Sequence, residues 1–427
     1  MPSNQPNSTS NDNNHEDLSN IHSANLYSLP FEIILKIFGY LDPAFLSRTV
    51  SRVCKRFAEI LGDEVFWKCK LLNQLTTHDR AVSVVTHPVN YGLNERPWWC
   101  GRDLLWRNLS VQFGILEEKW YTKRSLIKSN STANLHYAPV DTIKFLSNGT
   151  LIVSGGRDRT IIVSKVDDTN LTARKVNCAV RGHDGWIWDF AASDPDQFYS
   201  CGWDNQVNFW SLSHGLERIS QYNCRKPVMS ISSTPGLLAA GLHTPQIVLI
   251  DPRMTSYRDS EPNIATFDYH RRTITDVLLL PQRNLLLSIS EDRSLIYFDL
   301  RQHRPLKTVF VTDDTSFPRR MSIYRNMLYI GDARGKIYFH SIEDDTLKIP
   351  PVFLGQTRLI TAVQPLMSCV VAGSTAGFVK IFYPSNPPVY VWEQTFNGEV
   401  TCVDQHGDLL AVTSASNILS LFRPTSV

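Results

Sequence analysis

The chain has 427 residues, of which 42% are hydrophobic and 20% are charged, and its formal net charge is +2. This length exceeds one ordinary domain and allows a large core. The near-neutral charge argues against nucleic acid as a general partner, because phosphate binding usually requires a strongly basic domain. The uninterrupted apolar segments are too short to span a membrane, so we expect no membrane partner.

Residues 1–25 are rich in Asn and Ser and almost lack large apolar side chains. This composition predicts a disordered arm, and it lacks the features of a secretion signal. The eight cysteines are scattered without a C-x-x-C pair, which is typical of a reducing compartment and argues against structural zinc. We therefore expect an intracellular protein, cytoplasmic or nuclear, with no metal.

Residues 26–72 show the apolar spacing of short helices. Apolar side chains recur at every fourth position within LPFEIILKIFGYLD. These side chains are Leu29, Ile33, Ile37 and Leu41. Pro30 suits a first helical turn, and Asp42 followed by Pro43 predicts the start of a second helix. So small a module cannot bury all of its apolar groups, and the remaining apolar face should contact a partner.

This module resembles an F-box. The resemblance is carried, in order, by Leu29-Pro30, Glu32-Ile33, residues 50–57 (VSRVCKRF) and Trp67-Lys68. It implies docking on a Skp-type adaptor, and through it on the cullin and RING subunits of a ubiquitin ligase. Because a few apolar anchors usually dominate an interface, we expect five residues to contact the adaptor. They are Leu29, Pro30, Ile33, Ile37 and Leu41. The alternative is a helical bundle that serves only for packing.

Residues 73–119 have irregular apolar spacing. Leu104 and Leu109 suggest one or two helices, so we expect a helical connector here. The neighbouring Trp98 and Trp99 are more typical of packing than of a ligand site.

A β-repeat recurs seven times between about residue 120 and residue 427. Each copy has a small residue, a polar turn and a short strand, as in SGGRDRTIIVSK and SCGWDNQVNFWS. The copies can be aligned on Gly156, Gly202, Gly241, Ser290, Gly331, Gly373 and Ser414, which lie 39 to 49 residues apart. A period of about 40–45 residues with several short strands is typical of a β-propeller. We therefore predict a mostly β fold, with a seven-bladed propeller over residues 120–427.

The repeats resemble WD repeats. The second copy carries His183, Ser200, Asp204 and Trp210, which in WD repeats form a buried hydrogen-bond network. The fourth copy matches this pattern with His270, Ser288 and Asp292. With the preceding module, most of the chain resembles the F-box/WD-repeat family.

The last copy ends one strand short of a four-stranded blade. WD propellers commonly close their ring with a strand from the N-terminal side. We predict this strand at residues 120–127 (WYTKRSLI), where it would remove an exposed sheet edge.

Catalytic motifs are not evident in the sequence. Gly155-Gly156 lacks the following helix and lysine of a phosphate-binding loop, and no serine elbow or H-E-x-x-H motif is found. His183 and His270 lie at repeat positions that indicate a structural role. We therefore expect a protein that is not an enzyme and holds no cofactor.

Basic residues recur where the chain passes from one blade to the next. They are Arg225 with Lys226, Arg271 with Arg272, Arg319 with Arg320, and Arg358, and Trp186 lies in the matching loop of the second blade. Equivalent loops should emerge on one face, around one end of the central channel. Arginine can bind carboxylate or phosphate through two hydrogen bonds, so an acidic or phosphorylated protein substrate is expected. The alternative is solvated loop charge.

The family resemblance implies a substrate-recognition subunit of an SCF-type (Skp adaptor, cullin, RING) ubiquitin ligase. The F-box would bind the adaptor, and the propeller would bind the substrate. The alternative function is a WD-repeat scaffold that assembles a complex without driving degradation.

Overall fold

The computed structural model describes the helical segment 29–77 and most of the chain from residue 127 onward. The described ranges are 29–77, 106–107, 110–111, 114, 127–133, 135–167, 169–254, 263–324, 326–343, 351–365, 369–383 and 388–424. The predicted arm at residues 1–25 and most of the predicted connector at 73–119 lie outside them. The chain divides into two compact units, residues 1–62 and 63–427.

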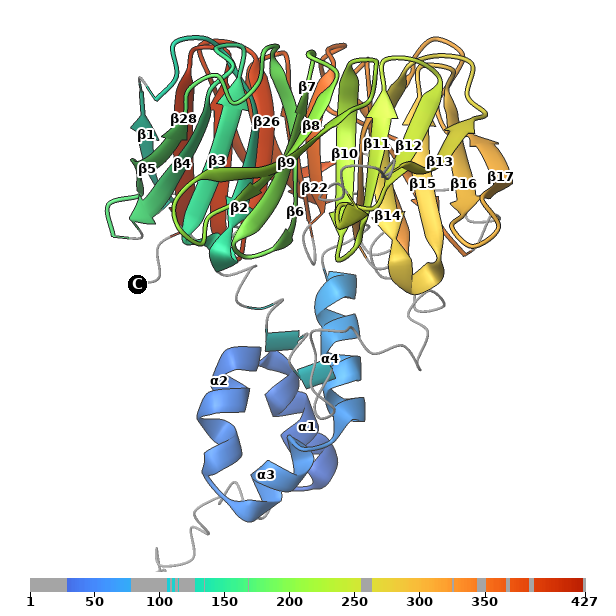
Figure 1. Ribbon diagram of the computed structural model, residues 1–427. Coiled ribbons are helices and arrows are strands. Elements are labelled where there is room, and N and C mark those ends of the chain that lie inside the picture. The colour runs from blue at the N-terminus through green and yellow to red at the C-terminus, as the bar shows by residue number, and fades with distance from the viewer. Residues whose placement is uncertain are drawn as a thin grey trace, which may run out of the picture. The chain divides into compact units, whose positions relative to one another are not determined.

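The first unit is built from short helices, drawn in blue in Figure 1. They are α1 (Phe31–Tyr40), α2 (Pro43–Arg48), the 3-10 helix η3 (Val50–Arg52) and α3 (Lys55–Ile60). α2 begins as predicted, because the Asp42 carboxylate accepts a 2.7 Å hydrogen bond from the Phe45 amide and Pro43 occupies the first turn. The rings of Phe38 and Phe57 meet edge to face at 5.2 Å in the core of this unit. The second unit begins with α4 (Glu64–Thr77).

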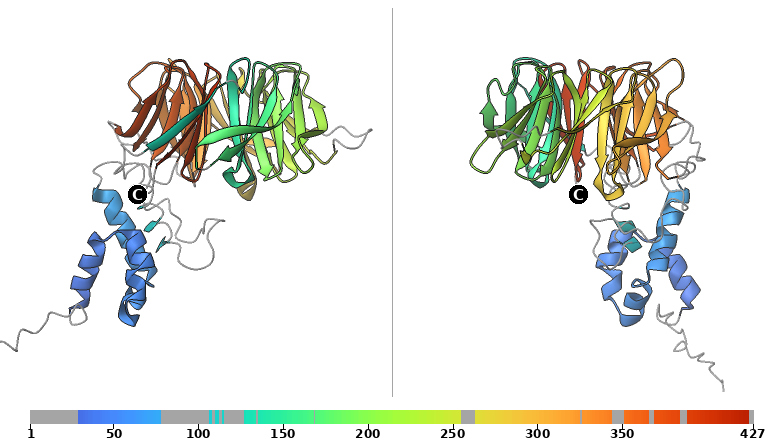
Figure 2. Two further views of the ribbon diagram at one scale, coloured as in Figure 1. Left: turned by 90° about the vertical axis from the view of Figure 1, so that its left-hand side faces the viewer. Right: turned by 45° about the vertical axis from the view of Figure 1, so that its right-hand side comes forward.

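The described strands of the second unit form seven four-stranded antiparallel sheets, as predicted. Figure 1 shows the sheets side by side with their strands roughly upright, and Figure 2 shows the same arrangement from two other sides. Blade 1 comprises β2 (Val140–Leu146), β3 (Leu151–Gly156), β4 (Ile161–Asp167) and β5 (Thr172–Ala179). Blade 2 comprises β6 (Ile187–Asp194), β7 (Gln197–Gly202), β8 (Gln206–Ser211) and β9 (Glu217–Asn223). Blade 3 comprises β10 (Val228–Thr234), β11 (Leu237–Leu242), β12 (Gln246–Ile250) and β13 (Asn263–Asp268).

The remaining blades follow the same strand order. Blade 4 comprises β14 (Ile274–Leu280), β15 (Leu285–Ser290), β16 (Ser294–Asp299) and β17 (Arg304–Phe310). Blade 5 comprises β18 (Pro318–Tyr324), β19 (Met327–Asp332), β20 (Lys336–Ser341) and β21 (Val352–Phe353). Blade 6 comprises β22 (Ile360–Pro365), β23 (Val370–Ser374), β24 (Phe378–Tyr383) and β25 (Val389–Thr395). Blade 7 comprises β26 (Val400–His406), β27 (Leu409–Ser414), β28 (Ile418–Pro424) and β1 (Ile127–Thr132).

The inner strands form a closed ring. Each one contacts the inner strand of the next blade, in the order β2, β6, β10, β14, β18, β22 and β26, and β26 contacts β2 again. In all seven blades the pairing of the inner strand with its neighbour shifts by one residue near the start of the strand. The bulged residues are Asp141, Trp188, Met229, Thr275, Arg319, Thr361 and Thr401. Because a bulge changes the direction of a side chain, these residues form a ring at one end of the channel.

The ring closes through a strand from the N-terminal side, but not at the predicted position. β1 spans Ile127–Thr132 and pairs antiparallel with β28, with Ile127 opposite Pro424. It shares only Ile127 with the predicted segment 120–127, and residues 120–126 lie outside the described residues. The reason for the difference is physical. β1 is an outermost strand whose side chains are mostly exposed, so its sequence IKSNST lacks the apolar pattern that the prediction relied on.

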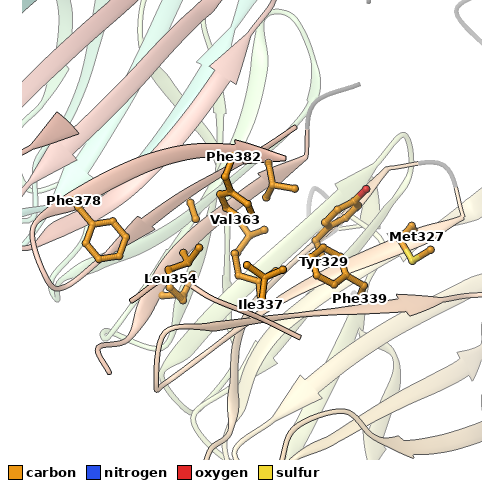
Figure 3. Packing of buried hydrophobic residues seen from close by; sticks show 12 residues of the cluster. Met327, Tyr329, Ile337, Phe339, Leu354, Val363, Phe378 and Phe382 are labelled. Atoms are coloured by element: carbon orange, nitrogen blue, oxygen red, sulfur yellow. The ribbon is translucent and has the colours of Figure 1, made fainter. Parts of the chain in front are cut away.

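The apolar core lies between neighbouring blades. Figure 3 shows the cluster that joins blades 5 and 6, in which Tyr329 and Ile337 of blade 5 face Val363 and Phe382 of blade 6. These side chains are at most 3% exposed. Each blade is therefore stabilised chiefly by burying its faces against the next blade.

No helix among the described residues is long and apolar enough to cross a membrane.

Candidate protein-interaction sites

The predicted apolar surface of the first unit lies away from its core. α1 buries Ile34 and Phe38, whereas Ile33 is 41% exposed. Pro30 is also exposed, and Leu29, Ile37 and Leu41 are partly buried. The guanidinium of Arg56 donates a 3.1 Å hydrogen bond to the Leu29 carbonyl and so fixes the residue just before α1 to α3. The five predicted contact residues thus remain at least partly accessible within this unit.

The first unit exposes further apolar residues that were not predicted from the sequence. They are Phe31, Tyr40, Phe45 and Val53, which are between 48% and 93% exposed. Helical periodicity would not have identified Phe31, because Phe31 lies three positions before Ile34 and seven before Phe38, on the helical face that these buried side chains occupy. Exposed aromatic side chains of this kind are typical of a protein-binding surface.

His183 and its partners form the buried network predicted for blade 2. Its Nε2 lies 2.6 Å from Ser200 Oγ, and its Nδ1 lies 2.9 Å from an Asp204 carboxylate oxygen. The indole of Trp210 also donates to Ser200 Oγ, at 2.8 Å. Burial acts to raise the pKa of Asp204, but hydrogen bonds from His183 and from backbone amides outweigh it and hold the pKa below its ordinary value. Both ring nitrogens of His183 are therefore occupied within the protein, as a structural role requires.

Blade 4 repeats this geometry. His270 Nε2 lies 2.7 Å from Ser288 Oγ, and Nδ1 lies 3.1 Å from the Asp292 carboxylate. The amide of Arg271 also donates to Asp292, at 2.8 Å, so the network fixes the loop that carries the predicted arginine pair.

Blade 1 contains a third network, which was not predicted from the sequence. His136 Nε2 lies 2.9 Å from Ser154 Oγ, and Nδ1 lies 2.8 Å from Asp158. The spacing could have identified it, because His136 precedes Ser154 by the same 18 positions that separate His270 from Ser288. Among the described residues no group of His, Cys, Asp and Glu side chains could hold a metal ion.

Most of the predicted basic residues lie where the sequence placed them. Arg225, Arg271, Arg272 and Arg358 are exposed in the segments just before β10, β14 and β22. Because the blades repeat one strand order around the ring, these segments emerge at the same end of the channel. We call these four residues the basic rim.

Arg319 and Arg320 lie within β18 and not in a loop, so they differ from the basic rim. The β18 bulge turns the pair toward the channel, and both residues are only partly exposed. Arg320 lines a channel cavity of about 250 Å³, and its Nη1 lies 3.9 Å from Asp189 Oδ2. Arg319 places its guanidinium 5.8 Å from the centre of the Trp188 ring. If Arg319 and Arg320 lay in a loop, as the sequence suggested, both guanidinium groups would be exposed to solvent.

Trp186 belongs to a cluster of aromatic side chains. It is 42% exposed and meets Trp203 edge to face at 6.2 Å. Trp203 also contacts Trp188, at 5.8 Å, and His243 of the next blade, at 5.2 Å. We call these four residues the aromatic wall. Arg157 of blade 1 lies 5.0 Å from the Trp186 ring and is held by the Asp141 carboxylate at 3.2 Å.

Comparison with known proteins identifies both parts of the chain. The F-box-like family matches residues 26–73. The family described as WD domain, G-beta repeat matches residues 128–163 and 174–211. This chain combines an F-box-like domain with WD repeats. The family resemblance expected from the sequence is thus confirmed, and the F-box-like domain spans the predicted module almost residue for residue.

Relatives with the same combination extend over most of the chain. The human F-box/WD repeat-containing protein 9 is 24% identical over 95% of this chain and 84% of its own length. The bovine protein of the same name is also 24% identical, over 93% of this chain and 82% of its own length. The F-box/WD repeat-containing protein mec-15 of Caenorhabditis elegans is 24% identical over 75% of this chain and 76% of its own length. The order of F-box-like domain and WD propeller therefore matches a substrate-adaptor type of protein.

Proposed function

We propose that this chain is the substrate-recognition subunit of an SCF-type ubiquitin ligase. One observation carries the proposal: the chain pairs an F-box-like domain with a WD propeller. The F-box-like domain exposes apolar side chains, and the propeller exposes arginine and tryptophan at one end of its channel. The F-box-like domain binds a Skp-type adaptor and, through it, the cullin and RING subunits. The propeller binds the substrate. The chain itself performs no chemistry, and it acts in the cytoplasm or nucleus.

Adaptor binding is assigned to Leu29, Pro30, Ile33, Ile37 and Leu41, joined by the exposed Phe31 and Phe45. Apolar side chains that are already exposed can be buried by a partner without unfolding the domain. A central aromatic residue usually contributes more to binding than its polar surroundings. We therefore place Phe31 beside the predicted anchors.

Adaptor capture tests this assignment. The double variant Leu29→Ala, Pro30→Ala should lose co-purification of a Skp-type adaptor, while the propeller keeps the thermal unfolding transition of the wild type. Val176→Ala serves as the matched control, since Val176 is a 54% exposed apolar residue of the outer strand β5. Undiminished adaptor recovery by the double variant would contradict the proposal.

Substrate binding is assigned to the basic rim, together with Trp186 and the arginine pair of β18. The rim carries four exposed guanidinium groups at one end of the channel. Planar guanidinium groups suit carboxylate and phosphate, so the proposed substrate is an acidic or phosphorylated protein segment. The double reversal Arg271→Glu, Arg272→Glu should reduce the set of proteins captured when ligase activity is blocked, and should leave adaptor capture intact.

Protein turnover separates this proposal from a scaffold function. Captured proteins should persist longer in cells that lack the chain, and their lifetime should shorten again when the wild type is restored. Restoration of the Leu29→Ala, Pro30→Ala variant should not shorten it. Equal lifetimes in all three cases would favour a scaffold that assembles a complex without driving degradation.

A further inference from the structure

Strand β17 forms an open edge with exposed apolar side chains. It is the last strand in the order β14-β15-β16-β17, so its outer edge pairs with no described strand (Figure 1). Leu306 is 53% exposed and Phe310 is 70% exposed. Within the described residues, the outer strands β5, β9 and β13 expose one large apolar side chain each. An edge of this kind is a template for pairing with another strand.

The backbone of β17 offers hydrogen bonds on its open side. The Val311 amide donates a 3.2 Å hydrogen bond to the carbonyl of Arg293, which lies just before β16. Because backbone groups of an antiparallel strand alternate in direction, the amides and carbonyls of Thr308 and Phe310 point away from β16. Val309 packs against the cluster between blades 4 and 5, so the exposed side chains lie on the opposite face of the strand.

The segment that contains β17 is complementary to itself when two copies run antiparallel. It reads RQHRPLKTVFVTDD from Arg301 to Asp314, with basic residues first, apolar residues in the middle and two aspartates last. Two copies centred on Thr308 place Leu306 opposite Phe310 of the other copy. Thr308 then meets its own counterpart, and the outward backbone groups of both copies are in register for hydrogen bonds.

The two ends of the segment carry complementary charges. Arg304 is exposed, and in this register it lies diagonally across from Asp314 of the second copy, a spacing that long side chains can bridge. Asp314 pairs with Arg293 of its own chain, but its side chain is 95% exposed and its carboxylate can accept a further hydrogen bond. Lys307 comes opposite Val309 of the second copy. The register therefore places no like charges directly opposite each other.

We propose that β17 pairs with β17 of a second copy of this chain, so that two propellers join in a symmetric dimer. The two four-stranded sheets of blade 4 then form one continuous antiparallel sheet. A two-fold axis through Thr308 repeats each contact twice. Because so short a segment makes a small interface, the dimer is reversible and the chain is monomeric when dilute. This inference goes beyond the proposed function and does not depend on it.

Sedimentation velocity of the full-length chain tests the inference. Between about 1 and 100 µM, where small interfaces associate, the average mass of the wild type should rise toward that of two chains. Phe310→Lys should weaken association about tenfold or more, because it replaces an apolar contact with a charge on both sides of the axis. A wild type that remains a single chain at the highest concentration would overturn the inference and leave this edge to a strand of another protein.

Ile264→Lys is the matched control for Phe310→Lys. Ile264 is a 44% exposed apolar residue of the outer strand β13, and its replacement should change the dissociation constant less than about twofold. Equal dissociation constants for the wild type and Phe310→Lys would show that any self-association uses another surface, and would overturn the inference.

A charge exchange locates the contact and decides the question if Phe310→Lys does not fold. Arg304→Glu places two carboxylates together across the axis, and Asp314→Arg places two guanidinium groups together. Each variant alone should therefore associate about threefold or more weakly than the wild type. An equimolar mixture should recover association, because each copy then supplies the charge that the other needs. A mixture that associates no more tightly than either variant alone would overturn the assignment to β17.

Discussion

Arg320 of β18 lies 3.9 Å from Asp189 of β6, although the two strands belong to blades 5 and 2 and are separated by two blades on one side and three on the other. The contact therefore crosses the channel. Burial raises the pKa of Asp189, and the charge of Arg320 partly opposes this effect. Asp189 in turn accepts a hydrogen bond from the Ile231 amide of blade 3. One side chain thus links three blades that the sheet hydrogen bonds do not join.

Loss of this cross-channel pair should destabilise the propeller. Arg320→Glu places two carboxylates together in a partly buried site, and should lower the free energy of unfolding by about 2–4 kcal/mol. Arg358→Glu at the exposed rim should lower it by less than about 0.5 kcal/mol. Urea denaturation monitored by tryptophan fluorescence measures both. Similar midpoints for the two variants would show that the pair contributes nothing to stability.

The histidine of the blade 2 network should be required for stability. His183→Ala leaves Ser200 and Asp204 without their buried partner, and should lower the free energy of unfolding by about 2–4 kcal/mol. His214→Ala is the control, because His214 is exposed beyond the end of β8. Differential scanning calorimetry should show a clear drop in Tm for the first variant only. An unchanged Tm would exclude a structural role for His183.

The turn carboxylates should make the propeller sensitive to acid. The pKa values of Asp158, Asp204 and Asp292 are lowered in the fold. Burial acts to raise each pKa, but hydrogen bonds from histidine and from backbone amides together outweigh it. A carboxyl group whose pKa is lower in the folded state stabilises the protein above the unfolded-state pKa, about 4. This stabilisation is lost as the pH falls through the folded-state value. The free energy of unfolding should therefore decline as the pH drops below about 4.

The variant Asp292→Asn tests the predicted direction of this pH dependence. It should be less stable than the wild type at neutral pH, and its free energy of unfolding should decline less steeply toward acid pH. Urea titrations between about pH 7 and pH 3 give both curves. Parallel curves would show that Asp292 does not contribute to the acid sensitivity.

The closing strand should decide whether the propeller stays monomeric. A chain truncated to begin at residue 135 lacks β1 and leaves the edge of β28 exposed. It should elute as oligomers or aggregate, whereas a chain that begins at residue 120 should elute as a monomer. Size-exclusion chromatography with light scattering makes the comparison. Identical elution of the two truncated chains would argue against ring closure by β1.

The sequence alone determined the features that repeat or act over short distances. The spacing of Gly156, Gly202 and their counterparts predicted seven blades, because each blade must bury the same faces against its neighbours. The order of His183, Ser200 and Asp204 predicted their network, since the three residues lie within one repeat. Asp42 predicted the start of α2 because capping is a local interaction.

The tertiary structure decided which residues meet across the channel and which strand closes the ring. Arg319 reaches Trp188 over 131 positions of sequence, and neither residue alone carries a periodic pattern that reveals the contact. The bulge in β18 also turns Arg319 and Arg320 away from the rim on which the sequence placed them. β1 is an outer strand with mostly exposed polar side chains, so it has no apolar pattern, and only its hydrogen bonds to β28 identify it. Packing between segments far apart in the chain depends on the closed ring, which no local pattern encodes.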